Sequence, residues 1–289
     1  MNLKTVKLLL TFFFLWVTTQ FGIDIENLLA YIFVLSLGIL HGSNDLKLIG
    51  NFSGEIRYTF RTKLSIYVFV VLFSFCFFLI FPTIGFLLFI LFSGYHFGEQ
   101  HLHTRPLQYV PTVHYLIYGF FLFGMLVSSH LDEVAALLLP MTGYSFIELP
   151  WEVMTITAGI LLSLLWIIDY RSFQGNTLQE AFYLLLFWAV FNSTDLALSF
   201  GLYFVLWQAL PSVADQINQT FGSFSRKHLK LYLVKGLPFW GAALIGFTVL
   251  LWANAELQGS LFPVLLAAGV GITFPHILLI GRLFKQSTT

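Results

Sequence analysis

Long apolar stretches recur along almost the whole of this 289-residue chain and are separated by short polar segments. Hydrophobic residues make up 58% of the chain and charged residues only 10%, as in polytopic membrane proteins. A backbone inside a bilayer must satisfy its own hydrogen bonds, so such stretches fold as helices. We therefore predict an all-α, polytopic integral membrane bundle of about eight to ten transmembrane helices, with residues 1–289 forming a single integral membrane domain.

Apolar runs place ten expected helices along the chain. They cover residues 5–21, 27–48, 64–81, 84–102, 113–129, 153–168, 178–191, 197–217, 234–253 and 262–283. Several runs are short for a membrane span, and residues 137–141 have the length of a re-entrant segment, so eight or nine spans also remain open. The first run lacks a small-residue cleavage site, which favours a membrane span over a removed signal peptide.

The charged residues predict how these helices are oriented. With ten spans, all 14 Lys and Arg fall on one side, together with both termini, and eight of the 14 acidic residues fall on the other. This asymmetry predicts a multi-pass protein of the cell (inner) membrane with cytoplasmic N- and C-termini. The net charge is zero and no basic patch is present, which argues against nucleic acid as a partner. The only cysteine is Cys76, so the chain forms no internal disulfide and no cysteine-based metal site.

A polar segment interrupts the second apolar run. His41 and Asp45 lie four residues apart and therefore share one face of a helix. Polar side chains at membrane depth require partners, so both residues are candidate site residues. Gly38 and Gly42 frame the histidine as G-x-x-x-G, which predicts the close approach of another helix.

The fourth run repeats this arrangement. Gly94 and Gly98 enclose His96, and the carboxylate of Glu99 follows within one helical turn. A satisfied histidine at a helix-packing site would explain either segment alone. The repetition, together with a third histidine near the C-terminus, favours a metal site.

Two later helices also carry polar residues next to a proline. Pro275 removes a backbone N–H beside His276 and opens its helix locally, which membrane helices tolerate where they line a cavity. The other segment contains Gln208, Ser212 and Asp215. Gln208 and the three candidate histidines lie about 12 to 15 residues from the outer ends of their helices, which at ~1.5 Å per residue predicts one common layer.

Imidazole ligands without thiolates suit iron, zinc, copper or nickel, and neighbouring carboxylates shift the interpretation toward non-haem iron. Asp45 and Glu99 would either ligate directly or accept the second ring N–H of a histidine. His101 and His103 are reserve ligands that we expect to be solvated near the membrane surface. No role is assigned to the remaining histidines, His114, His130 and His228.

At these residues the chain resembles the Brp/Blh family of membrane β-carotene 15,15′-dioxygenases. The resemblance rests on H-G-x-x-D at His41 to Asp45, H-F-G-E at His96 to Glu99, and T-x-P-H at Thr273 to His276. It covers essentially the whole chain. It implies an Fe(2+)-dependent enzyme that cleaves β-carotene with O2 at the central double bond to two retinal, for retinal biosynthesis or carotenoid catabolism. The apolar substrate would enter from the lipid membrane.

The chain departs from this family on one helix. The resemblance implies an H-x-x-x-H pair where this sequence has Gln208 and Ser212. Of the family's iron ligands, His41 and His96 carry over, and His276 or a carboxylate would complete the metal site. Asp45, Glu99, Gln208, Ser212 and Asp215 are then weak ligands or neighbours of the ligands. No catalytic side chain is expected beyond the metal site.

Two other classes of function remain open. The missing histidine pair is also compatible with a non-catalytic membrane protein that binds a carotenoid or a retinoid. Intramembrane histidine and aspartate residues are also found in small-ion or proton transporters. Hydrolase, phosphate-loop and zinc-protease motifs are absent from the sequence.

Overall fold

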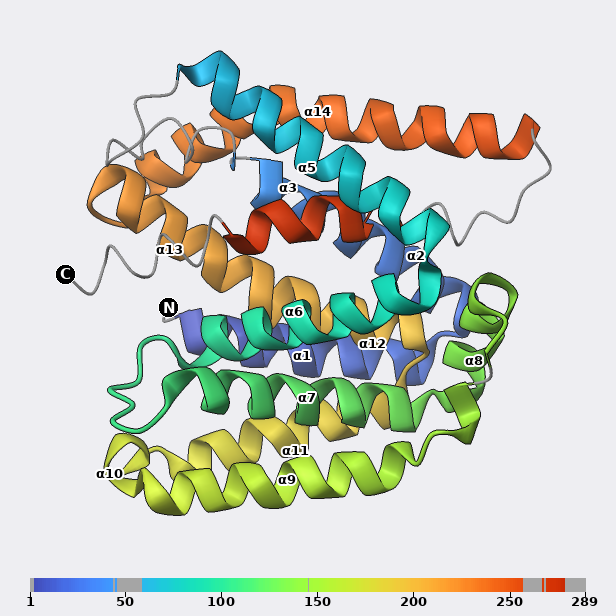
Figure 1. The fold of residues 1–289 in the computed structure, drawn as a ribbon. Coiled ribbons are helices and arrows are strands. Elements are labelled where there is room, and N and C mark those ends of the chain that lie inside the picture. Colours follow the sequence, from blue (N-terminus) through green and yellow to red (C-terminus); the bar gives the residue numbers. More distant parts are fainter. Residues whose placement is uncertain are drawn as a thin grey trace. The chain divides into compact units, whose positions relative to one another are not determined.

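The computed structural model describes residues 3–43, 45, 59–144, 146–256, 267 and 269–278. This part of the chain consists of helices and contains no β-strand (Figure 1). In chain order the labelled elements are α1(Leu3–Gln20), α2(Ile23–Phe33), η1(Val34–Gly38), α3(Ile39–Ser43), α5(Phe60–Ile80), α6(Pro82–Leu102), α7(Pro111–Ser129), α8(Leu131–Thr142), η2(Phe146–Glu148), α9(Trp151–Ile168), α10(Tyr170–Phe173), α11(Thr177–Ser193), α12(Leu196–Tyr203), η3(Phe204–Ala209), α13(Leu210–Phe221) and α14(Arg226–Glu256). A further helix covers Gly269–Leu278. The all-α prediction is confirmed.

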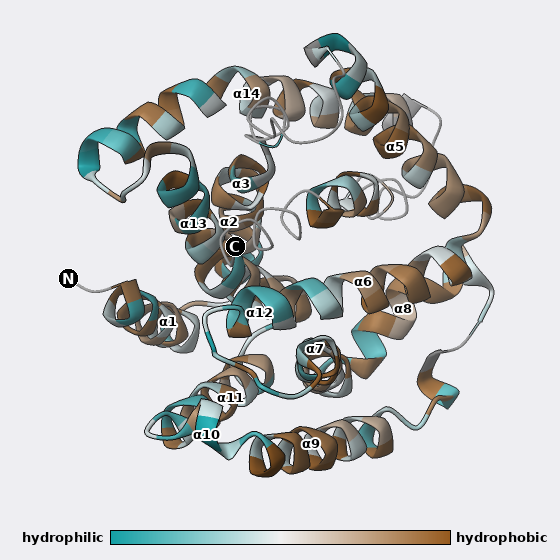
Figure 2. Ribbon diagram, turned by 60° about the vertical axis from the view of Figure 1, so that its left-hand side comes forward, coloured by the Kyte–Doolittle hydropathy of each residue, from teal (hydrophilic) through white to brown (hydrophobic). Residues whose placement is uncertain are grey.

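Within the described residues, six helical segments are long and apolar enough to cross a membrane. They are Ile23–Gly42, Arg61–Ile80, Pro111–Ser129, Trp151–Ile168, Leu196–Phe221 and Arg226–Ala253. In Figure 2 the hydrophobic colour covers much of α5 and α9, as expected for helices whose surroundings are lipid. These segments confirm a polytopic membrane bundle. The last predicted helix, 262–283, lies partly outside the described residues.

The observed helix ends show what hydropathy alone detects. The helices predicted at 84–102, 113–129 and 153–168 end where expected and begin two residues earlier, as α6, α7 and α9. The first residues of α6 and α7 are Pro82 and Pro111, which suit a first helical turn because the N–H that proline lacks is unused there. The helix predicted at 234–253 begins at Arg226 because its charged first turns are helical as well.

The segment considered for re-entry forms the C-terminal part of a separate short helix. At ~1.5 Å per residue, the 12 residues of α8 extend ~18 Å, which is too short for a hydrocarbon core of ~30 Å. The helix ends at Gly143, whose φ of +66° is the left-handed conformation that terminates many helices.

The chain divides into two compact units, Met1–Val34 with Ile90–Pro211, and Leu35–Phe89 with Ser212–Thr289. In the first unit, α7 packs along α9 and α11, and α12 packs against α2 (Figure 1). In the second unit, α14 packs against α3. A buried cluster of Val213, Ile217 and Tyr232 also joins α13 to α14. The assignment of a single integral membrane domain stays a prediction.

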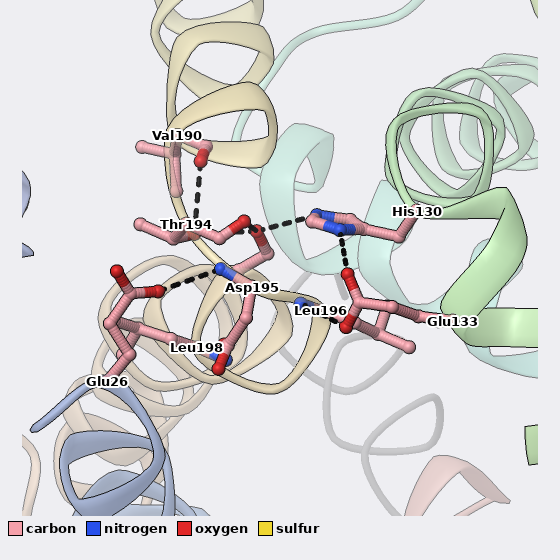
Figure 3. A network of polar contacts seen from close by, with 9 residues as sticks. Glu26, His130, Glu133, Val190, Thr194, Asp195, Leu196 and Leu198 are labelled. Atoms are coloured by element: carbon pink, nitrogen blue, oxygen red, sulfur yellow. Dashed lines mark hydrogen bonds and ion pairs between the residues drawn. The ribbon is translucent and has the colours of Figure 1, made fainter. Parts of the chain in front are cut away.

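A buried histidine ties helix ends together in the first unit (Figure 3). His130, between α7 and α8, contacts Oε1 of Glu133 at 2.9 Å and the hydroxyl of Ser199 at 3.0 Å. The second carboxylate oxygen of Glu133 accepts the backbone N–H of Leu196 at 3.2 Å. This network holds the corner between α7 and α8 against the start of α12. His130 therefore has a structural role, although the sequence assigned it none.

Candidate functional site

The second unit buries a cluster of two histidines and one carboxylate. His276 Nδ1 lies 2.9 Å from Asp45 Oδ1 and 3.0 Å from Oδ2. Asp45 is fully buried and His276 is 4% exposed. The His41 and His276 rings meet edge to face with their centroids 4.7 Å apart. The structure thus brings together three residues that the sequence singled out, from two ends of the chain.

The contacts of the two imidazoles determine their tautomers. His41 Nδ1 lies 2.5 Å from the carbonyl oxygen of Gly38, which only accepts, so Nδ1 is the donor. His276 Nδ1 donates to the Asp45 carboxylate by the same reasoning. In both rings Nε2 is then the nitrogen with the lone pair, which is the form in which a histidine ligates a metal. The donor chemistry fits two positions of an iron site.

Asp45 also accepts a hydrogen bond from a residue that the sequence analysis did not select. The hydroxyl of Tyr67, on α5, lies 3.1 Å from Asp45 Oδ2. A buried carboxylate requires such donors, because burial without hydrogen bonds is costly. Tyr67 and His276 together hold the carboxylate, and the carboxylate in turn orients the His276 ring.

A π-helical segment places His41 in this cluster. Wider π turns commonly occur at functional sites, and η1 ends three residues before His41. Inside η1, the carbonyl of Leu35 accepts the indole N–H of Trp240, on α14, at 2.8 Å. This bond from a neighbouring helix supports the local departure from α-helical pairing.

A second hydrogen-bonded chain reaches the backbone of His41. The Gln216 amide, on α13, donates to the carbonyl of His41 at 3.2 Å and lies 3.2 Å from the hydroxyl of Ser212. Tyr232, on α14, donates to the Gln216 carbonyl at 2.7 Å. Ser212 is therefore linked to His41 through Gln216, whereas Asp215 is half-buried on α13. The sequence offered a signal for Gln216, since it lies four residues after Ser212 on a polar helix face.

In the first unit, the glycines around His96 serve a close helix crossing, as predicted. A methyl group at Gly98 would collide with the backbone carbonyl of Tyr115 on α7. One at Gly119 would collide with the backbone of Gly94. Gly42 differs, because a methyl group there would meet atoms of Asp45, His276 and Ile272 only at 3.9–4.0 Å, which is ordinary contact. The prediction of a close helix approach is therefore wrong for Gly42.

The remaining candidates of the first unit are buried. His96 is 3% exposed, and Glu99 accepts the hydroxyl of Tyr95 at 2.9 Å. Gln208 lies in η3, another π-helical segment, and is 1% exposed. Neither atom of its amide has a hydrogen-bond partner among the residues that the structure describes. Its neighbour Trp207 donates to the hydroxyl of Thr11 at 3.1 Å, which joins η3 to α1.

His101 is not solvated, in contrast to the expectation from its position near the membrane surface. Its Nε2 lies 2.8 Å from Glu180, whose other oxygen pairs with Arg105. The His101 ring also stacks on Tyr118 at 4.6 Å. The partner carboxylate comes from α11, 79 residues away, so the sequence alone could not indicate this contact. His103 is half-buried against the Gln100 carbonyl at 2.9 Å.

The candidates therefore fall into two groups. His41, Asp45, Ser212, Asp215 and His276 belong to the second unit. His96, Glu99 and Gln208 belong to the first, and the prediction that they meet the others at one metal stays a prediction. Within either unit, the described side chains include no group of three His, Cys, Asp or Glu residues arranged to hold a metal ion.

Comparison with known proteins identifies a family. No curated protein and no solved structure matches the chain. A model of the beta-carotene 15,15'-dioxygenase family matches residues 32–284, a range that includes all of the candidate site residues. The chain therefore belongs to the β-carotene 15,15′-dioxygenase family.

Proposed function

We propose that this protein is an iron-dependent β-carotene 15,15′-dioxygenase, which uses O2 to cleave β-carotene at its central double bond into two molecules of retinal. The observation that carries the proposal is the buried pair of His41 and His276, each with its Nδ1 proton held by an oxygen acceptor. Family membership supplies the reaction class and the carotenoid substrate.

The metal-binding part of the proposal assigns His41, His96 and His276 as ligands of Fe(2+). Two of these imidazoles already share a buried cluster in the second unit. When bound, ferrous iron supplies the O2-activating chemistry that side chains lack. Asp45, Glu99, Gln208, Ser212 and Asp215 are proposed as neighbours of the ligands or as weak ligands.

Asp45 is a positioning residue in this proposal. Its carboxylate holds the Nδ1 proton of His276, which keeps the lone pair on Nε2 and fixes the orientation of the ring. Tyr67 stabilises the carboxylate from α5. A carboxylate that is already engaged by two donors is better suited to orienting a ligand than to ligating by itself.

The overall reaction requires no proton transfer by side chains of the protein. The double bond of the alkene and the O–O bond break, and each of the two carbons gains one oxygen atom. No proton, water or external reductant enters the balance, so no general acid or base is required. The chain must bind an apolar polyene from the bilayer, align its central bond and exclude water, and a bundle of apolar helices suits these tasks.

The buried amide of Gln208 also supports the proposal. A buried polar group without a hydrogen bond is rare in proteins and often indicates an absent ion, water or ligand. Both atoms of this amide lack a hydrogen-bond partner among the described residues. We propose that its oxygen would face the metal, at a position where the resemblance to the family implies a histidine.

The test is expression in a bacterium that makes β-carotene. We expect bleaching of the cells, accumulation of retinal and iron in the purified protein. His276→Ala should abolish both retinal formation and iron binding. His228→Ala is the matched control, because His228 contacts the backbone carbonyl of Ser223 outside the proposed site. Equal retinal formation by wild type and His276→Ala would contradict the proposal.

A carotenoid-binding protein without catalysis is the second candidate. The observation that favours it concerns Ser212, which stands where the family resemblance implies a histidine ligand. Its hydroxyl is already engaged by the Gln216 amide. The same experiment distinguishes the two candidates. Copurification of intact β-carotene with a protein free of iron would support the binding protein and exclude the enzyme.

A further inference from the structure

The π-helical segment η3 holds Gln208 in a backbone conformation that requires support from outside the segment. The backbone N–H of Leu210 donates to the carbonyl of Val205, five residues earlier, which is the π pattern. Such turns are rare and short, because α-helical pairing competes with them. Gln208 is buried, and neither atom of its amide has a hydrogen-bond partner among the described residues. Its side chain therefore contributes no hydrogen bond that would hold the segment in place.

The neighbouring residue, Trp207, anchors the segment. Its indole N–H donates to the hydroxyl of Thr11, on α1, at 3.1 Å. Its ring lies edge to face with the rings of Tyr183 and Phe187, on α11, at centroid distances of 4.7 and 4.8 Å. The Lys7 ammonium lies 4.3 Å from the ring centroid. Trp207 is buried, so α1 and α11 together fix the position of its side chain.

Thr11 is well placed to accept this hydrogen bond. Its hydroxyl donates its own proton to the carbonyl of Lys7 at 2.8 Å, which leaves the oxygen lone pairs for the indole N–H. A buried indole N–H requires such an acceptor, because burial without a hydrogen bond is unfavourable. The rings of α11 supply packing against Trp207, and the Thr11 hydroxyl supplies the directional contact.

The helix that carries Thr11 lies outside the part of the chain that matches the family model. The match covers residues 32–284, whereas α1 ends at Gln20. Gln208 lies within the match, at a position where the resemblance implies a histidine ligand. A histidine ligand is held by its bond to the metal, but a neutral amide oxygen is a weaker donor and depends more on support from the protein. Support from α1 should therefore matter in this chain.

We propose that Thr11 is a positioning residue that acts through Trp207, holding η3 in its π conformation and thereby fixing the direction in which Gln208 projects. Each residue of an α-helix turns by ~100°, so relaxation of η3 to α-helical pairing would rotate the side chains on one side of the segment relative to those on the other. The consequence for the reaction rests on the proposed function, in which Gln208 faces the metal.

Amide hydrogen exchange of the full chain in nanodiscs tests the anchor independently of catalysis. Thr11→Val keeps the shape of the side chain and removes the acceptor, and we expect exchange of residues 204–210 to become about five- to tenfold faster. Thr11→Ser keeps the hydroxyl and should restore slow exchange. Thr18→Val is the matched control, because Thr18 is also buried on α1 and its hydroxyl donates to the carbonyl of Leu15 on the same helix. It should leave exchange of residues 204–210 unchanged.

A double-mutant cycle tests whether Thr11 acts through Trp207. Trp207→Phe keeps an aromatic ring and removes the N–H, so it should also speed exchange of residues 204–210. The double variant should exchange no faster than Thr11→Val alone, because the donor left without an acceptor is then gone as well. Effects that multiply would show two independent contributions and would overturn the inference. Trp207→Phe alone decides the question if Thr11→Val does not fold.

Steady-state cleavage of β-carotene measures the consequence for the site. We expect Thr11→Val to lower kcat by about the same factor and to leave KM nearly unchanged, because Gln208 is proposed to face the metal and not the polyene. In a Gln208→Ala background, Thr11→Val should have no further effect on kcat. A further fall in that background would show that α1 acts by another route, and the inference would fail.

The outcomes separate this inference from the proposed function. Unchanged exchange in both Thr11→Val and Trp207→Phe would overturn the inference, whatever the cleavage assay shows. Faster exchange with an unchanged kcat would also overturn it, since η3 would then be anchored without positioning a group of the site. Faster exchange in a protein whose wild type forms no retinal would support the anchor of η3 and contradict the proposed reaction.

Discussion

His41 and His96 are both buried histidines that lie between two glycines and precede a carboxylate, but different contacts surround them. Around His41, side chains from distant parts of the chain converge, and Asp45 and His276 form a direct hydrogen bond. Around His96, the glycines bring two helix backbones into contact, and Gly98 lies against the carbonyl of Tyr115. The first segment is organised by polar side chains and the second by close helix packing.

The difference shows that G-x-x-x-G around a histidine has two separable physical meanings. Glycine at 98 is required because the Tyr115 backbone on α7 occupies the space that a side chain would fill, whereas a methyl group at Gly94 would meet the backbone of α7 only at 3.6–3.7 Å, which is ordinary contact. Glycine at 42 leaves ordinary contact distances, so space does not require it. Substitutions that affect one kind of contact and spare the other test this distinction.

The largest effect is expected from removing His276 from the cluster that it forms with His41 and Asp45, here called the His41 cluster. His276→Ala deletes a proposed iron ligand and leaves the Asp45 carboxylate buried without that donor. We expect iron affinity to fall by more than the ~10- to 100-fold range typical of residues that only support a ligand. Metal analysis of purified protein measures this. Unchanged iron content would remove the His41 cluster from the metal site.

Asp45→Asn should have the next largest effect. The amide cannot hold the Nδ1 proton of His276 as the carboxylate does, and we expect iron affinity to fall by ~10- to 100-fold. Tyr67→Phe is the matched comparison, because it removes one hydrogen bond to the same carboxylate without changing the charge. Iron titration should rank wild type above Tyr67→Phe and Tyr67→Phe above Asp45→Asn. A reversed order would contradict the positioning role of Asp45.

Alanine substitutions at Gly98 and Gly42 compare the two glycine frames directly. Gly98→Ala forces α6 away from α7, and we expect a loss of ~1–3 kcal/mol of stability. Gly42→Ala meets no close atom, and because alanine favours helix it should stabilise the fold by up to ~1 kcal/mol. Thermal unfolding in detergent measures both changes. Equal destabilisation by the two variants would show that both glycines serve close helix packing.

Gln208→His tests whether η3 faces the metal. Imidazole is a better donor to iron than a neutral amide oxygen, so a severalfold rise in iron occupancy and in retinal formation is expected. Asn192→His is a control on an exposed position at the end of α11. If neither variant changes iron content, Gln208 lies away from the metal, and the proposal for its amide must be abandoned.

The smallest effect concerns Asp169, which follows α9 and accepts hydrogen bonds from the loop after α6, the helix of His96. Burial acts to raise the pKa of the Asp169 carboxyl, but hydrogen bonds from Ser172, Gln108 and Tyr109 outweigh it and hold the pKa below its ordinary value. A lowered pKa in the folded state stabilises the protein above the pKa of the unfolded chain. This stabilisation is lost as the pH falls through the folded-state pKa.

The corresponding measurement is the thermal midpoint of wild type and Asp169→Asn between neutral and acidic pH. The wild type should be more stable at pH 7, and the difference should vanish under acidic conditions as Asp169 becomes protonated. A difference that is independent of pH would show that the variant acts through packing. The His41 cluster lies in the other unit and should not contribute to this difference.

Helix positions and the membrane class were readable from the sequence for a physical reason. Lipid offers the backbone no hydrogen-bond partners, so an apolar run of sufficient length must be helical whatever lies next to it. The predicted ends of α6, α7 and α9 agree with the structure because hydropathy changes at the same residues. The candidate histidines could also be selected, since polar side chains are rare at membrane depth.

The contacts of those histidines depended on tertiary structure. Asp45 and His276 are 231 residues apart, and their hydrogen bond exists only because two distant helices pack together. Periodicity also cannot detect the π-helical segments that carry Gln208 and precede His41, since Trp240 supports one of them from another helix. The sequence by itself determined a helical membrane protein with buried histidines. Packing between helices decided that His276 meets a carboxylate and that Gly98, beside His96, meets a neighbouring backbone.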